Sequence, residues 1–225
     1  MEPHVLDRPV WQALTSRQAG LALGDARAWR MEPRHGPFAA AADASAESLV
    51  ALGALIPADG ELWLVEVVEM PLPPGAVAVR RAVLAQMVAE GISDGPEPDF
   101  VALGEGDAAE MLALATLTAP GPFLSLTHRL GDFIGIKADG RLVAMAGERM
   151  RPEGHTEVSG VCTHPDWRGR GLAGGLMRVV SRRILARGDV PFLHSYASNA
   201  GAIALYEKLG FRIRREMGVT VIGRG

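Results

Sequence analysis

The feature that most constrains the fold is a strand, a glycine-containing loop and an amphipathic helix that follow one another between residues 156 and 186. Residues 156–163 have the pattern of a strand, and from residue 171 to residue 186 the apolar side chains recur at helical spacing. Between them lies Arg168-Gly169-Arg170-Gly171-Leu172-Ala173. The first N–H groups of a helix lack intrahelical partners, and the helix dipole is positive there. This order therefore predicts an anion site at the loop.

The residues around this unit predict a mixed α and β region. We expect strands at 100–103, 133–138, 141–147, 191–197 and 211–222, and helices at 108–117 and 199–209. Asp139-Gly140 between two apolar runs indicates a tight hairpin. On the 156–163 strand, alternation would place Glu157, Ser159, Val161 and Thr163 on one face. The predicted order is β-α-β-β-β-α-β-α-β.

A stretch of turn-forming residues and prolines at 91–98 predicts a boundary between residues 1–95 and residues 96–225. The first part has 7 basic and 12 acidic side chains, and the second part has 16 and 14. In the first part we expect helices at 11–23 and 45–55, the second capped by Ser45, and a strand at 61–68. Residues 77–89 fit either a strand or a helix.

Composition excludes several classes of protein. The net charge of −3 argues against non-specific binding to nucleic acid or anionic lipid, and no apolar run reaches the length of a membrane span. The first residues do not have the pattern of a secretory signal, so we expect a cytoplasmic protein. Cys162 is the single cysteine, and no histidine pair has metal-binding spacing, so no metal site is expected. Six arginines between residues 164 and 187 suit a small polyanionic ligand.

An Arg/Gly loop before a helix is by itself more often a plain turn than a binding site. Here a second block follows about 30 residues later, in which Asn199 opens a helix that ends with Tyr206, Gly210 and Phe211. With both blocks, the sequence from about residue 98 to residue 225 resembles the GCN5-related N-acetyltransferase (GNAT) superfamily. Its Arg/Gln-x-x-Gly-x-Gly/Ala motif matches residues 168–173. Some relatives carry a degenerate copy of the fold ahead of the active one; residues 1–95 lack the loop motif, so such a copy should not bind coenzyme A.

The resemblance implies a GNAT fold, with a mixed, mostly antiparallel sheet that splays apart between the strands at 156–163 and 191–197, flanked by helices and preceded by a smaller α/β region. It also implies acetyl-CoA as acyl donor. Its pantetheine arm would lie along the backbone of Val161, Cys162 and Thr163, with Asn199 on the other side. The residues implied to hold its pyrophosphate are Arg168, Gly169, Arg170, Gly171, Leu172 and Ala173.

The resemblance further implies two catalytic residues. Glu157 matches the carboxylate that acts as general base in some members. The alternative interpretation of Glu157 is a solvated strand residue. Tyr206 matches the tyrosine that protonates the leaving sulfur in many members. The alternative interpretation of Tyr206 is a half-buried helix tyrosine with a hydrogen-bonded hydroxyl. His164, His194 and Ser195 are second-rank site candidates. Cys162 as an acyl-carrying nucleophile is disfavoured, because a lone strand cysteine is usually a small buried apolar residue.

The expected activity is transfer of an acetyl group from acetyl-CoA to a primary amine by direct attack on the thioester. The alternatives are a non-catalytic acyl-CoA-binding regulatory module and a nucleotide phosphate-binding domain of another class, whose glycine motifs are absent from the sequence. The acceptor, either a small molecule or an amine of a peptide or protein, is not specified by the sequence. Members of the family often form homodimers.

Overall fold

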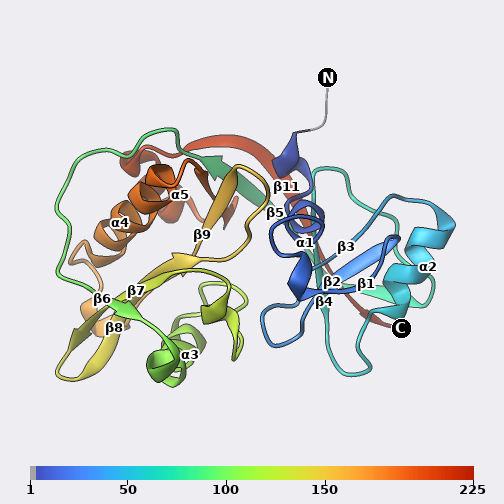
Figure 1. Ribbon diagram of the computed structural model, residues 1–225, viewed down its shortest axis with the longest axis horizontal. Coiled ribbons are helices and arrows are strands. Elements are labelled where there is room, and N and C mark those ends of the chain that lie inside the picture. Colours follow the sequence, from blue (N-terminus) through green and yellow to red (C-terminus); the bar gives the residue numbers. More distant parts are fainter. Residues whose placement is uncertain (1–3) are drawn as a thin grey trace.

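The computed structural model describes residues 4–225, which form two sheets and five α-helices (Figure 1). A small antiparallel sheet has the order β1 (Ala22–Asp25), β2 (Ala28–Met31), β3 (Ala39–Ala41). The large sheet has eight strands in the order β4 (Leu62–Glu66), β11 (Arg212–Arg224), β5 (Ala76–Val88), β10 (Val190–Tyr196), β9 (His155–Thr163), β8 (Arg141–Glu148), β7 (Phe133–Ala138), β6 (Val101–Leu103). All its pairings are antiparallel except β9 with β10.

Two of the helices lie on opposite faces of the large sheet, and two others pack against the small sheet. The helices are α1 (Pro9–Leu14), α2 (Ala46–Ala54), α3 (Ala108–Thr118), α4 (Leu172–Ala186) and α5 (Ala200–Leu209). The apolar face of α4 packs with Ala144, Ala146 and Val158 in one core cluster, whereas α3 packs with Met145 and Cys162 in another. Between residues 4 and 225, no helix is long and apolar enough to cross a membrane.

The element order predicted for residues 98–225 is confirmed. The chain runs through β6, α3, β7, β8, β9, α4, β10, α5 and β11, with ends within two residues of those expected. At the hairpin, Asp139 and Gly140 have φ values of 51° and 74°. Two successive positive φ values are those of the tight turn whose twist matches paired strands.

Residues 11–23 were predicted as one helix, and this prediction is wrong. The helix α1 ends at Leu14, and the chain then passes through a 3₁₀ turn at Ala19–Leu21 into β1. The amide of Gln18 explains the change, because it donates to the carbonyl of Arg149 and accepts from the N–H of Arg151 at 2.8 and 3.0 Å. A tertiary contact therefore outweighs local helix propensity.

Residues 77–89, which fitted either a strand or a helix, form most of β5. This strand pairs with β11 along its whole length, and residues 84–88 also pair with β10. Strand β11 in turn pairs with β4, so strands from both sides of the predicted boundary at residue 95 alternate in one sheet. Figure 1 shows β5 and β11 running across the middle of the molecule between the two parts. The described parts of both regions are thus joined by backbone hydrogen bonds.

The sheet opens between β9 and β10. The two strands pair only at three positions, the last of which joins Glu157 to Phe192. Beyond it β9 continues alongside β8, and β10 continues alongside β5. The splayed sheet expected from the resemblance is therefore present, and one edge of β9 is left open along its second half.

A β-bulge changes which side chains of β9 share a face. The pairing shifts between Met145/Cys162 and Gly147/Ser159, and Gly160 has a φ of 62°. An extra residue in one strand reverses the alternation of side chains. Val158 therefore packs toward α4 and Cys162 toward α3. The expectation that Glu157 and Ser159 share a face with Val161 and Thr163 is corrected, because strict alternation ends at the bulge.

The shared sheet makes a prediction about the boundary at residue 95. A chain shortened to residues 96–225 loses β5, so β10 and β11 lose their common partner and expose unpaired backbone groups. We expect this fragment to lack a cooperative thermal transition by circular dichroism, whereas the full chain has one. A soluble fragment with a cooperative transition would instead show that residues 96–225 form an independent domain.

Candidate active site

The Arg/Gly loop ends in an uncapped helix N-terminus. Gly169 and Gly171 have φ values of 77° and 74°, and a Cβ added to either would meet no atom within 4 Å. Gly171 is the N-cap of α4 and provides no side-chain cap, and the first intrahelical bond runs from Gly175 N to Gly171 O. The preceding N–H groups therefore face open space with the positive end of a 15-residue helix behind them.

Of the six arginines between residues 164 and 187, only Arg168 and Arg170 lie at this loop. Arg170 stacks over the Trp167 ring, with 4.3 Å between its Cζ atom and the ring centroid. The others make contacts elsewhere: Arg178 with Pro96, Arg182 with Asp94 and Glu97, Arg183 with Phe100, and Arg187 with Asp132 and Glu148. The expectation that the whole cluster serves one anion is therefore corrected, because most of it fastens α4 to its surroundings.

Two cavities meet in the split between β9 and β10. The first, which we name the loop pocket, has a volume of about 580 Å³ and contains the predicted residues 161–163, 168–173 and Asn199 in its lining. The second, which we name the central pocket, has a volume of about 270 Å³ and lies between the split and the N-terminal part of the chain. Five residues line both cavities: Thr118, Pro120, Val161, Asn199 and Tyr206.

The loop pocket has unpaired polar groups along one wall. The second half of β9 has no strand on its β10 side, and Thr163 Oγ1 is a buried hydroxyl oxygen without a partner among residues 4–225. On the other wall, Asn199 caps α5 by accepting a hydrogen bond from Ala202 N at 3.2 Å through Oδ1. This leaves its amide N–H₂ free to donate. The pocket therefore offers polar groups along an extended path that ends at the helix α4.

Tyr206 lies where the two pockets join. Its ring packs edge-on against Phe211, with centroids 6.5 Å apart. Among residues 4–225, its hydroxyl has no hydrogen-bond partner. Burial raises the pKa of Tyr206 above its ordinary value near 10. The phenol is therefore protonated at neutral pH and is able to donate a proton into either pocket.

Glu157 is buried where β9 and β10 separate, with 1% of its surface exposed. Its carboxylate accepts two hydrogen bonds from Arg149, at 2.9 and 2.8 Å, and one from His194 Nδ1 at 2.8 Å. Burial opposes ionisation, but the charge and hydrogen bonds of Arg149 and the bond from His194 outweigh it and hold the pKa of Glu157 well below its usual range. It is not the solvated strand residue that its sequence position also allowed.

A hydrogen-bond chain continues from His194 to the N-terminal segment. Gln86 Nε2 lies 3.0 Å from His194 Nε2 and donates to Leu6 O at 2.8 Å, while Gln86 Oε1 accepts from Arg214 Nε at 2.6 Å. Arg214 also contacts Asp7. Because Gln86 donates to Nε2 and Glu157 accepts from Nδ1, the ring proton of His194 lies on Nδ1, toward Glu157.

Several residues of the central pocket were not predicted from the sequence. Phe38, Trp63 and Leu84 come from the first 95 residues, and residues 118–122 come from the last residue of α3 and the segment after it. None belongs to a motif, and only the fold of the N-terminal part against the split brings them there. His194 and Ser195, which were second-rank candidates, do line this pocket.

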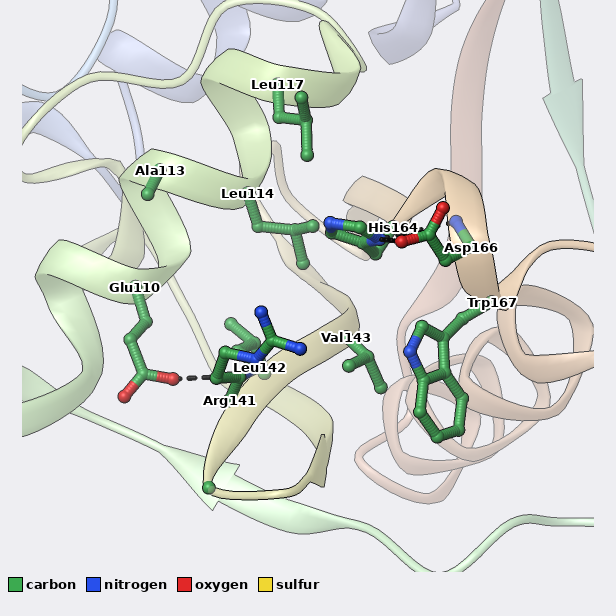
Figure 2. Close-up of a pocket in the computed structure, with 11 residues that line it drawn as sticks. Glu110, Ala113, Leu114, Leu117, Arg141, Leu142, Val143, His164, Asp166 and Trp167 are labelled. Carbon is green, nitrogen blue, oxygen red and sulfur yellow. Dashed lines mark hydrogen bonds and ion pairs between the residues drawn. The ribbon is translucent and has the colours of Figure 1, made fainter.

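A separate cavity of about 380 Å³ lies between α3, the start of β8 and residues 164–167 (Figure 2). Its wall is mostly apolar, with Val143 beside the Trp167 indole and Leu114 pointing toward His164, and the Leu142 N–H donates to Glu110 Oε2 at 2.9 Å. Trp167 also lines the loop pocket, so it lies between that pocket and this separate cavity. His164 lines this separate cavity, and its Nδ1 accepts from Asp166 N at 3.3 Å.

Burial raises the pKa of the Cys162 thiol to about 11, despite a hydrogen bond with Thr118. A thiol with this pKa is almost wholly protonated at neutral pH, and only the thiolate is a strong nucleophile. This favours packing over acyl transfer as the role of its side chain. Within residues 4–225 there is no group of three or more side chains able to hold a metal ion.

A sheet split between two parallel strands, with a glycine-rich helix N-terminus at the open edge, is the arrangement that the resemblance to the GNAT superfamily implied. The profile of the family described as FR47-like protein matches residues 133–218. A crystal structure of a protein described as an acetyltransferase of the GNAT family, from Novosphingobium aromaticivorans, is 51% identical; the match covers 99% of this chain and 100% of that one, with a TM-score of 0.93. The chain belongs to the GNAT family of acetyltransferases.

More distant structures share the fold. A GCN5-related N-acetyltransferase from Kribbella flavida is 18% identical, with 96% of this chain and 95% of that one covered and a TM-score of 0.61. A GNAT acetyltransferase from Colwellia psychrerythraea is 14% identical, with 65% and 58% covered and a TM-score of 0.53. The search of the curated proteins finds no significant match.

The loop geometry predicts a selective effect of Gly171→Leu on coenzyme A binding. Gly188, at the other end of α4, has a φ of 84° and the same open surroundings, so Gly188→Leu is a matched control. Each variant should lose about 1–2 kcal/mol of stability, because a non-glycine residue is strained at positive φ. Only Gly171→Leu should raise the Kd for coenzyme A, by about 10-fold or more, in calorimetry. Equal Kd values for the two variants would refute the assignment of the loop.

Proposed function

We propose that the protein transfers an acetyl group from acetyl-CoA to a primary amine by direct attack on the thioester. The observation that carries this proposal is the junction of the loop pocket and the central pocket at Val161, Asn199 and Tyr206. A donor held in one pocket and an amine in the other would meet at this junction. Holding two reactants in such contact lowers the barrier by about 7–11 kcal/mol when they are well aligned.

The loop pocket suits the donor on both of its walls. The N–H groups from Gly169 to Ala173 and the side chain of Arg168 or Arg170 would bind the pyrophosphate. Backbone groups of Val161 and Thr163 at the open edge of β9 would pair with the pantetheine amides as a strand does, with Cys162 between them. The free amide of Asn199 would donate from the opposite wall. The buried, unpaired Thr163 Oγ1 supports this fit, because such a hydroxyl ordinarily has a partner.

Tyr206 is positioned to act as the general acid. The thioester supplies an activated acyl carbon, and bond cleavage releases a thiolate that needs a proton. Tyr206 lines both pockets, and its raised pKa keeps its hydroxyl protonated. General acid catalysis of this kind contributes about 10²- to 10⁴-fold.

For Glu157, the contacts support a role other than the general base implied by the resemblance. Four hydrogen bonds occupy its carboxylate, and the lowered pKa makes it a weak base. We propose that the amine reacts from its neutral fraction, and that Glu157 holds Arg149 and His194 in place. The base role stays a prediction that the pH profile described below tests.

A non-catalytic acyl-CoA-binding module would need the loop pocket alone. The central pocket beyond Tyr206, walled by aromatic side chains of the N-terminal part, favours a second substrate and hence turnover.

Replacing Tyr206 by Phe should lower kcat by about 100-fold, because the departing thiolate loses its acid. The Kd for coenzyme A should stay unchanged. Tyr196→Phe is the matched control. Tyr196 lines the central pocket but not the loop pocket, so its replacement can change the KM for the amine but should leave kcat near the wild-type value. The release of thiol from acetyl-CoA, measured with a panel of amines, gives kcat for both variants. Full activity of Tyr206→Phe would exclude the acid role.

The roles proposed for Glu157 and Tyr206 predict how the rate of acetyl transfer depends on pH. The rate at limiting amine should rise with pH between 6 and 9 in proportion to the neutral amine, since no carboxylate base would titrate in this range. It should fall only at a pH above about 10, as Tyr206 loses its proton, because a raised pKa keeps the acid form up to that pH. A profile that levels off once a carboxylate ionises, well below the pKa of the amine, would restore Glu157 as the base.

A further inference from the structure

Arg149 presents a free edge of its guanidinium to the central pocket. The Nε and Nη2 atoms donate to Glu157, and the guanidinium lies over the Phe38 ring, with 4.7 Å between Cζ and the ring centroid. The remaining nitrogen, Nη1, has no hydrogen-bond partner among residues 4–225. It points toward residues 119–122, since a Cβ added to Gly121 would lie 3.9 Å from it. Arg149, Phe38 and Gly121 all line the central pocket.

The guanidinium is held along one edge and over one face. Its side chain is 11% exposed, the Glu157 carboxylate fixes one edge and Phe38 supports one face. Glu157 is fixed in turn by His194, whose tautomer is set by Gln86. A donor held in this way costs little entropy when a ligand binds to it. The free Nη1 therefore works as a preorganised hydrogen-bond donor in the wall of the pocket.

The charge of this site selects among oxygen acceptors. Glu157 already neutralises Arg149 in a buried ion pair. A carboxylate at Nη1 would be a second anion against a single cation, within a few ångströms of Glu157. A neutral carbonyl oxygen accepts the same hydrogen bond without this repulsion.

The size of the pocket brings this oxygen close to the reacting amine. The central pocket of about 270 Å³ holds both Arg149 and Tyr206 in its lining, so amine and oxygen must lie on one small fragment. Beyond Trp63 and Tyr196 the central pocket continues into a surface groove, which we name the outer groove, lined also by Arg30, Pro33, Pro57 and Arg80. An acceptor that extends past the carbonyl therefore has a path to solvent.

We propose that Arg149 is the specificity-determining residue for the acceptor, and that it binds the neutral carbonyl oxygen of an α-amino amide, with Glu157 as its positioning residue. This inference rests on the proposed acetyl transfer to amines. Two sources share this chemistry, a small amino-acid amide and the N-terminal residue of a peptide. The outer groove accommodates both.

The test compares three acceptors of similar size with acetyl-CoA and the full chain: phenylalaninamide, phenethylamine and phenylalanine. After the rate of each acceptor is corrected for its fraction of neutral amine, the kcat/KM of phenylalaninamide should exceed that of phenethylamine by about 10-fold or more. This ratio corresponds to one hydrogen bond to a charged donor. Phenylalanine should be the poorest. A phenylalanyl dipeptide amide distinguishes the two sources. If its kcat/KM exceeds that of phenylalaninamide, the acceptor is the N-terminal residue of a peptide.

Arg149→Lys keeps a cation beside Glu157 but removes the fixed planar edge. The preference for the amide over phenethylamine should fall to about 2-fold or less, through a higher KM for the amide, while the Kd for coenzyme A stays unchanged. Arg187→Lys is the matched control, because Arg187 pairs with the buried Glu148 outside both pockets and should keep the wild-type preference.

The outcomes separate the two proposals. Transfer to amines without preference for the amide, or an unchanged preference in Arg149→Lys, overturns the role of Arg149 and leaves acetyl transfer standing. Highest activity with free phenylalanine overturns the choice of a neutral oxygen. No transfer to any acceptor, with coenzyme A still bound, overturns the proposed function and this inference with it. If Arg149→Lys does not fold, the acceptor comparison with the unaltered protein decides alone.

Discussion

The buried Glu157 carboxylate is the interaction on which the rest of the site depends. It lies at the last paired position between β9 and β10, where the sheet begins to open. Arg149 and His194 satisfy it from the two sides of the split. Removing one partner of a buried ion pair typically costs about 3–5 kcal/mol, because the remaining charge is left unpaired. The same contacts that fix the strands therefore also fix the side chains that face the central pocket.

The long strand β5 extends this constraint into the N-terminal part. Because β5 lies between β10 and β11, Gln86 reaches His194 on one side and Arg214 on the other. The N-terminal part is thereby held against the open split, where Phe38 and Trp63 form a wall of the central pocket. Within the described residues, the loop pocket is lined by segments of the C-terminal part alone, whereas the central pocket needs both parts.

Local patterns predicted the conformation of the Arg/Gly loop. Glycines at 169 and 171 and the apolar spacing of α4 act within one strand-loop-helix unit, so the loop took the expected shape. Predictions failed where a distant group intervened. Gln18 ends α1 by bonding to the backbone at residues 149 and 151, and the bulge at Gly160 reverses the side-chain alternation of β9. Glu157, expected as a base or as a solvated residue, is buried against an arginine from the adjoining hairpin.

The sequence by itself determined the order of elements after residue 98, the family, and the loop with its positive helix end, because these depend on short-range spacing and backbone conformation. The tertiary structure decided the ionisation of Glu157, the tautomer of His194 and the free edge of Arg149. Each of these depends on burial and on partners up to about 130 residues away, as with Gln86 and Arg214. It also decided that the first part of the chain forms a wall of the central pocket, because only strand pairing across the whole chain brings it there.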